Sequence, residues 1–216
     1  PYVPMVAFKN AFISYGRADS KAFAIQLNQR LTDAGLAVWF DAEDIPFGID
    51  YQDEIDAGII NADNFLYVIS PHSVNSPYCD KELTLALEHN KRIIPLMHVE
   101  EISQSTWQTR NSSGTDEEWQ VYQAKGLHSS HVNLNPVVGR INWIFFNEGN
   151  DFESSTQALL EVIGHHQAYT RQHTEFLSKA LSWEEHQRQD SYLLTPQDSE
   201  AARGWLQTQF LESLPP

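Results

Sequence analysis

Five short apolar runs, separated by stretches of helical pattern, constrain the fold of this 216-residue chain more than any other feature. Apolar and polar residues hardly alternate within the runs, which is typical of strands that are buried on both faces of a parallel sheet. The first intervening stretch has Phe23, Leu27 and Leu31 at helical spacing and ends at Gly35, a residue suited to a left-handed helix cap. We expect strands at residues 11–15, 37–41, 64–70, 92–98 and 141–146, and helices at about 19–34, 51–61, 76–90 and 152–166.

The alternation of strands and helices predicts an α/β fold built on a flavodoxin-like five-stranded parallel sheet. Right-handed crossovers with helices on both faces favour the strand order 2-1-3-4-5. In such a sheet, ligands bind beyond the carboxyl ends of the strands where the strand order reverses, here between the first and third strands. The sequence therefore predicts a crevice lined by residues 15–17 on one side and 70–82 on the other.

One carboxylate, Glu82, belongs to the helix that borders this crevice. Ser76 is a good N-cap and Pro77 suits the first helical position, so the helix begins here. Cys79 and Leu83 belong to an apolar stripe, and Glu82 lies in the neighbouring stripe, at the rim of the core. A glutamate on a helix is most often a solvated surface residue, but this one faces the predicted crevice. Glu82 is therefore our candidate for a catalytic residue.

Four blocks of the sequence are informative in combination: AFISYGRADS, GLAVWFDAEDIPFG, ADNFLYVISPHSVNSPYCDKELTLAL and RIIPLM. Together they resemble a TIR (Toll/interleukin-1 receptor-like) domain of the bacterial NADase type, and the resemblance covers residues 8–166. In enzymatic members of that family, the glutamate of an aromatic-Cys-x-x-Glu motif is the catalytic residue of an NAD glycohydrolase. The resemblance assigns this role to Glu82 in YCDKE, residues 78–82, although many members have Trp where this chain has Tyr78.

The implied chemistry needs only one carboxylate. Ordinary glycosidases use two, because a poor leaving group must be protonated while a second carboxyl group attacks or stabilises the sugar. Nicotinamide in NAD is already a cationic pyridinium and leaves as a neutral molecule, so no acid is required. An ionised Glu82 would hold the ribose and stabilise positive charge at its anomeric carbon. Attack by water would give ADP-ribose and attack by an internal nucleophile a cyclic product, and the sequence leaves both open. NAD is thus a substrate, and we expect no bound cofactor.

The predicted crevice and the resemblance together suggest the residues that contact the substrate. Arg17 follows the first strand, where a guanidinium could meet phosphate or stack on a ring; otherwise it is a surface arginine. The predicted substrate-binding residues are Ser14, Tyr15, Gly16, Arg17, Asp41, Ile45, Phe47, Gly48, Ser70 and Tyr78.

The loop at residues 42–51, AEDIPFGIDY, matches the BB loop of TIR domains. Pro46 and Gly48 are turn residues, while Ile45 and Phe47 are apolar residues that a monomer would have to expose or fold inward. In related assemblies this loop reaches a neighbouring TIR domain. The resemblance therefore implies other TIR domains as partners, in a homo-oligomer formed through this loop.

Composition restricts the partners and the compartment. With 29 acidic residues against 14 Lys and Arg, the formal charge is −15, which opposes binding to nucleic acid or to an anionic membrane. No apolar stretch is long enough to span a bilayer, and the first ten residues lack the regions of a signal peptide. A single cysteine, Cys79, excludes an intramolecular disulfide and fits a reducing compartment. We therefore expect a cytoplasmic protein.

The sequence predicts no metal site and no common nucleotide-binding motif. The pairs His128 with His131 and His165 with His166 lack accompanying cysteines or carboxylates at ligand spacing. Neither GxGxxG nor a Walker A sequence is present, which argues against hydride transfer on a Rossmann site and against a P-loop.

Two segments lie outside the bare five-strand unit. The insertion at 99–140 is too long for an ordinary connection, and we expect in it a short helix capped at Thr115 or Asp116 that directs Trp119 and Tyr122 to the body. Residues 167–216 form the second expected domain, a helical extension in which a second helix begins at Pro196. Its apolar residues either pack on the TIR body or form a connection to another domain or a dimer interface. They are Tyr169, Phe176, Leu177, Ala180 and Trp183.

The function predicted from these observations is NAD cleavage by a TIR domain. The resemblance places such enzymes among effectors of antiphage immunity or regulated cell death, often as part of a larger protein with a downstream sensor domain. The alternative from another class is a non-catalytic scaffold that signals through TIR–TIR contacts, which would need neither Glu82 nor the crevice. A third possibility is a nucleotide-sugar or nucleoside transferase on a similar fold.

Overall fold

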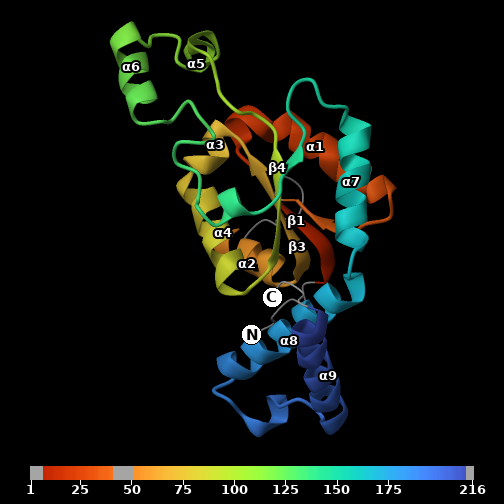
Figure 1. Cartoon of the computed structure of the whole chain (residues 1–216). Coiled ribbons are helices and arrows are strands. Elements are labelled where there is room, and N and C mark those ends of the chain that lie inside the picture. Colours follow the sequence, from red (N-terminus) through yellow and green to blue (C-terminus); the bar gives the residue numbers. More distant parts are fainter. Residues whose placement is uncertain (1–6, 41–50, 213–216) are drawn as a thin grey trace.

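The computed structural model describes residues 7–40 and 51–212, with side chains described to residue 208. Its centre is a five-stranded sheet in the order β2-β1-β3-β4-β5 (Figure 1). All neighbouring strands are parallel. The fold class and the strand order predicted from the sequence are confirmed. The strands are β1 (Lys9–Ser14), β2 (Val38–Trp39), β3 (Ala62–Ile69), β4 (Arg92–Met97) and β5 (Ile144–Phe145).

Both edge strands are shorter than predicted. β2 and β5 contain two residues each, whereas β3 contains eight. An edge strand pairs with one neighbour only, so apolar runs at 37–41 and 141–146 overestimate its length. Residue 41 lies outside the described residues.

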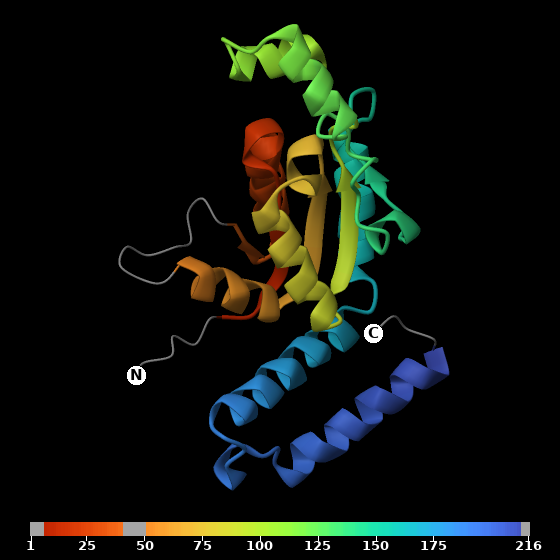
Figure 2. The same ribbon diagram turned by 90° about the vertical axis from the view of Figure 1, so that its left-hand side faces the viewer.

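Helices cover both faces of the sheet (Figures 1 and 2). α1 (Arg17–Asp33) and α7 (Phe152–Gly164) pack on one face, and α2 (Tyr51–Ile60) and α4 (Pro77–Glu88) pack on the other. Side chains of the central strand β3 alternate between the two cores: Leu66 and Val68 belong to the first, Phe65, Tyr67 and Ile69 to the second. Every residue of β3 is buried, as expected for a strand covered on both sides.

Local capping fixes the two helix boundaries that the sequence marked most clearly. The Ser76 hydroxyl accepts a hydrogen bond from the Cys79 backbone N–H, and Pro77 occupies the first turn of α4. α1 is followed by Gly35, whose φ of 87° is favourable only for glycine. A short helix, α3 (Pro71–Val74), precedes α4.

The part of the 99–140 insertion that contains its two helices projects beyond the carboxyl end of β4 (Figure 2), and Val138 near its end packs in the core. It contains α5 (Gln104–Arg110), α6 (Asp116–Ala124) and the 3-10 turn η1 (Val138–Arg140). The predicted cap at Thr115 is confirmed, because its hydroxyl accepts from the Glu118 N–H while Glu118 accepts from the Thr115 N–H.

The expected direction of two aromatic side chains in the insertion was wrong. Trp119 and Tyr122 pack on Trp107 of α5, with ring centroids 5.6 and 6.0 Å from that indole, in a small core of their own. The prediction failed because α5, which supplies Trp107, was not foreseen.

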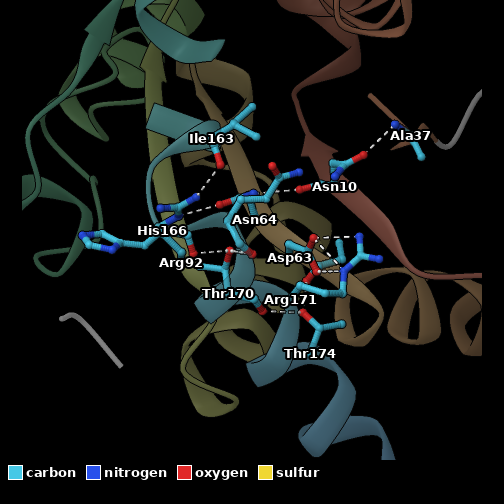
Figure 3. A network of polar contacts seen from close by, with 12 residues as sticks. Asn10, Ala37, Asp63, Asn64, Arg92, Ile163, His166, Thr170, Arg171 and Thr174 are labelled. Atoms are coloured by element: carbon cyan, nitrogen blue, oxygen red, sulfur yellow. Dashed lines mark hydrogen bonds and ion pairs between the residues drawn. The ribbon is translucent and has the colours of Figure 1, made fainter. Parts of the chain in front are cut away.

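The C-terminal helices lie at the opposite, amino end of the sheet (Figure 1). They are α8 (Gln167–Glu185), the turn η2 (Asp190–Tyr192) and α9 (Pro196–Glu212). Arg171 of α8 donates three hydrogen bonds of 2.8 to 3.0 Å to the buried carboxylate of Asp63 at the start of β3 (Figure 3). Phe176, by contrast, contacts Trp205 of α9. The face of α8 that docks on β3 is thus polar, while Tyr169 and Phe176 contact Trp205 of α9.

In the described ranges, 7–40 and 51–212, no helix combines the length and the apolar composition needed to cross a membrane.

Candidate active site

A pocket of about 500 Å³ opens at the carboxyl ends of the strands, between α1, α2 and α4. It lies where the strand order reverses, which is the place that the topology predicts for a ligand. Its described lining consists of Tyr15, Gly16, Arg17, Tyr51, Gln52, Ile55, His72, Ser76, Tyr78, Cys79 and Glu82.

The Glu82 carboxylate is held from the end of β1. The Ser14 hydroxyl donates a hydrogen bond of 2.5 Å to Glu82 Oε2, a length typical of a hydroxyl bound to a charged carboxylate. Ser14 is 1% exposed, so its own position is fixed by the core. Glu82 is half-buried at the rim, as the helical pattern predicted. The bond joins residues that are 68 positions apart and presents a carboxylate to the pocket.

Two neighbours of Glu82 remain protonated at neutral pH. Burial raises the pKa of the Cys79 thiol to about 12, and the charge of Glu82 raises it further. Burial also raises the pKa of the Tyr67 hydroxyl well above its usual range. Neither group is therefore an anion at neutral pH, so neither adds negative charge beside the Glu82 carboxylate. A protonated thiol is also a poor nucleophile.

The wall opposite Glu82 combines the Arg17 cation with the Tyr51 ring, and a second ring, Tyr78, lies on α4 itself. Arg17 Nη2 donates to the Tyr51 hydroxyl at 3.1 Å, which joins the first turn of α1 to the first turn of α2. Tyr51 and Tyr78 are 46% and 75% exposed, so large aromatic surfaces stand at the pocket mouth. The arrangement offers a guanidinium for phosphate and rings for stacking.

A hydrogen-bond network behind the pocket fixes α3 against α1. Asp19 Oδ1 accepts from the Ser70 hydroxyl at 2.7 Å, and Asp19 Oδ2 accepts from the His72 N–H at 2.9 Å. Gly16 permits this close approach, because a Cβ at its position would lie 2.7 Å from the Ser73 nitrogen and 2.9 Å from the His72 Cβ.

The structure brings most of the described candidate residues together and separates one. Tyr15, Gly16, Arg17, Tyr78 and Glu82 line the pocket, and Ser14 contacts Glu82 from behind. Ser70 is fully buried and caps α3, so the expected substrate contact must be corrected to a structural one. The remaining four candidates lie outside the described residues: Asp41, Ile45, Phe47 and Gly48.

Six residues of the described lining were not among the predicted site residues: Tyr51, Gln52, Ile55, His72, Ser76 and Cys79. Gln52 and Ile55 are three positions apart at the start of α2, and this spacing places them on one face. His72 directly follows Ser70 and Pro71 at the end of β3, within the region that the switch-point rule indicated.

The fold and this glutamate-bearing pocket define an α/β protein with a pocket at its topological switch point. The family model described as TIR domain matches residues 11–160. The chain belongs to the TIR domain family.

Relatives with assigned activities match a smaller part of the chain. A protein of Bacteroides thetaiotaomicron named 2' cyclic ADP-D-ribose synthase BtTIR is 32% identical over 91 residues, 40% of this chain and 32% of that protein. The NAD(+) hydrolase TcpC of Escherichia coli O6:H1 is 26% identical over 92 residues, 40% of this chain and 30% of that protein. The chain thus spans about a third of the length of the curated relatives it matches.

Among solved structures, the TIR domains of the activated Roq1 resistosome superpose with a TM-score of 0.50 at 17% identity. The match covers 71% of this chain and 98% of that one. At this identity, the likeness concerns the fold alone.

Proposed function

We propose that this chain is an NAD glycohydrolase of the TIR type, which breaks the bond between nicotinamide and ribose and yields ADP-ribose or a cyclic ADP-ribose. The observation that carries the proposal is the Glu82 carboxylate, held by Ser14 in the wall of the switch-point pocket. The names of the relatives, a cyclic ADP-ribose synthase and an NAD hydrolase, support the same chemistry.

The geometry suggests how a single carboxylate would act. As the glycosidic bond breaks, nicotinamide takes the bonding electron pair and leaves neutral, and positive charge develops on the ribose. Glu82 would accept hydrogen bonds from the ribose hydroxyls and stabilise that charge. The Ser14 hydroxyl fixes one carboxylate oxygen before the substrate arrives, so little reorganisation is needed during the reaction.

The proposal includes activation by self-association, in an effector of bacterial immunity or cell death. Two residues of the pocket lining adjoin the 42–51 loop in sequence: Tyr51 is its last residue, and Gln52 follows it. The exposed ring of Tyr78 adds apolar surface at the pocket mouth. A second TIR domain that reached this mouth would cover these rings and exclude water from the bond to be cleaved.

The test is the release of nicotinamide from NAD by the purified chain and by Glu82→Gln, over a wide range of protein concentration. We expect Glu82→Gln to lose about a hundredfold or more in kcat with an unchanged melting temperature, because a half-buried helix position accommodates glutamine. Activity per molecule should rise with concentration. Chromatography of the products identifies the linear or the cyclic nucleotide.

Two results would contradict the proposal. Near-normal turnover by folded Glu82→Gln would remove this residue from the mechanism. No cleavage by the wild-type chain at any concentration, together with self-association, would favour a non-catalytic TIR scaffold.

A further inference from the structure

A second cavity, of about 710 Å³, adjoins the candidate active site. His72 lines both cavities, and the consecutive residues Arg17 and Ala18 line the first and the second, respectively. The two spaces therefore share a wall made by the start of α1 and by α3. The insertion, which stands over this end of the sheet in Figure 2, supplies the rest of the lining: Ile102, Trp107, Arg110, Asn111, Ser112, Ser113, Gly114, Glu118 and Tyr122.

We propose that this second cavity binds the adenine nucleotide half of NAD. The inference rests on the proposed function, since it takes NAD as the substrate of the Glu82 pocket. The nicotinamide ribose then occupies the first cavity, and the pyrophosphate crosses the wall at His72.

The sizes of the two spaces favour this division. A cavity of roughly 300–1,000 Å³ holds a drug-sized ligand, and the Glu82 pocket, with about 500 Å³, is within that range. NAD consists of two nucleotides joined through a pyrophosphate and is larger than such a ligand. The pocket accommodates the half that reacts, and the adjoining cavity provides space for the other half.

The charge of the second cavity suits a diphosphate. The whole chain carries a formal charge of −15, so a site for phosphate needs a local cation. Arg110, in the last turn of α5, supplies it, and it makes no ion pair with any carboxylate in the part of the chain that the structure describes. The negative residue of the lining, Glu118, accepts a hydrogen bond of 2.8 Å from the Thr115 N–H in the capping box of α6. Its carboxylate is therefore engaged by the N-terminus of its own helix.

Aromatic rings in the same wall suit an adenine base. Tyr122 and Trp107 line the cavity, and their ring centroids are 6.0 Å apart. Burial raises the pKa of the Tyr122 phenol, and the positive charge of Arg110 lowers it in part. An arginine in the same lining as the half-buried Tyr122 ring offers a base a stacking surface and offers its phosphates a planar set of donors. The exposed turn at Ser112 and Ser113 adds hydroxyl groups at the opening.

The experiment measures equilibrium binding of ADP by calorimetry, alongside the KM for NAD. We expect Arg110→Ala to weaken ADP binding and to raise the KM about tenfold or more, with kcat nearly unchanged. Ser112→Trp, on an exposed turn, should do the same by filling the cavity. The matched control is Arg140→Ala: this exposed arginine of the same insertion donates to the Pro136 carbonyl and lines neither cavity, so its loss should change neither constant.

The outcomes separate this inference from the proposed function. ADP binding that depends on Arg110 and Ser112, but not on Arg140, supports the subsite. If NAD is cleaved but ADP does not bind, or binds equally well to Arg110→Ala, the subsite is overturned and the proposed function stands. If the wild-type chain fails to cleave NAD at any concentration, the proposed function fails, and an ADP site dependent on Arg110 would then belong to a nucleotide-binding protein without this activity.

Discussion

The two ends of the sheet use polar residues in different ways. At the amino end, charged and amide groups are joined to one another: the Asp63 side chain, 1% exposed, is bound by Arg171, and the side-chain Oδ1 of Asn64 accepts from Arg92 Nε at 2.6 Å (Figure 3). At the carboxyl end, Glu82 and Arg17 line a pocket of about 500 Å³. The first set fastens α8 to the strands, whereas the second set is exposed to the pocket.

This difference in burial indicates which polar side chains can be substituted without loss of stability. Removing one partner of a buried ion pair lowers the free energy of unfolding by about 3 to 5 kcal/mol, because the other charge is left buried without compensation. A carboxylate at the rim of a pocket keeps access to water when its neighbours change. Variants at the amino end should therefore affect stability, and variants at the carboxyl end should affect kinetics.

The largest effect on stability is expected for Arg171→Leu. It leaves the Asp63 carboxylate buried without its cation, and we expect a loss of about 3 kcal/mol in the free energy of unfolding. Urea titration measures it. Lys179→Leu is the matched control on the same helix, since the pair Lys179 with Asp198 is 47% and 36% exposed and should contribute less than about 1 kcal/mol. Equal losses in both variants would contradict the contrast between enclosed and exposed pairs.

A smaller effect should appear in the pH dependence of stability. Burial lowers the pKa of Lys91 to about 7, and its Nζ donates to the Ala62 carbonyl at 2.9 Å. Between pH 7 and the pKa of a lysine in the unfolded chain, the unfolded state binds more protons, so stability rises with pH. The slope should be on the order of 1 kcal/mol per pH unit between about 7 and 9. Above about pH 9 the buried Cys79 thiol opposes it, because its pKa is raised.

Lys91→Met tests this assignment, because it removes the titrating group and retains an apolar stem. Urea titrations at several pH values should give a flatter profile for the variant than for the wild type. An unchanged slope would show that another group accounts for the pH dependence.

At the carboxyl end, Arg17→Ala should raise the KM for NAD about tenfold with little change in kcat, because the contact is made equally in ground and transition states. Arg17→Lys should recover only part of the affinity, since lysine lacks the planar fork that also donates to Tyr51. Steady-state kinetics distinguish the roles: an unchanged KM with a collapsed kcat would assign Arg17 to transition-state stabilisation.

The smallest effect is expected for Ser14→Ala. Loss of the hydroxyl that holds Glu82 Oε2 should lower kcat by about threefold to tenfold and leave the KM nearly unchanged. Ser20→Ala is the control, because Ser20 is equally buried and bonds His98 Nδ1 at 2.9 Å, away from the pocket lining. Equal kcat values for both variants would limit Ser14 to packing.

The sheet and the position of the pocket could be predicted because they depend on patterns that recur along the chain. Apolar runs mark the strands, and the order of elements fixes where the strand order reverses. The glutamate was found for the same reason: capping residues at Ser76 and Pro77 set the phase of α4 and place Glu82 at its rim.

The parts that sequence reasoning missed depend on contacts between polar residues or on isolated apolar ones. α5, QSTWQTR, has Trp107 as its single large apolar residue, which is too little for a helical stripe. The face of α8 that docks on β3 carries Thr170, Arg171 and Thr174. Helical hydrophobic periodicity selects the apolar face of a helix as the buried one, so it could not identify this polar face. These polar contacts depend on Asp63 at the start of β3, which is 108 positions from Arg171 in the sequence.

The state of Cys79 has a practical consequence for labelling experiments in solution. It is the chain's sole cysteine, 5% exposed, and with a pKa of about 12 it forms almost no thiolate at neutral pH. Maleimide reagents should therefore leave the native protein unlabelled. A cysteine introduced at position 48 or 110 would then carry a fluorophore at that site alone, and the wild-type chain would serve as the unlabelled background.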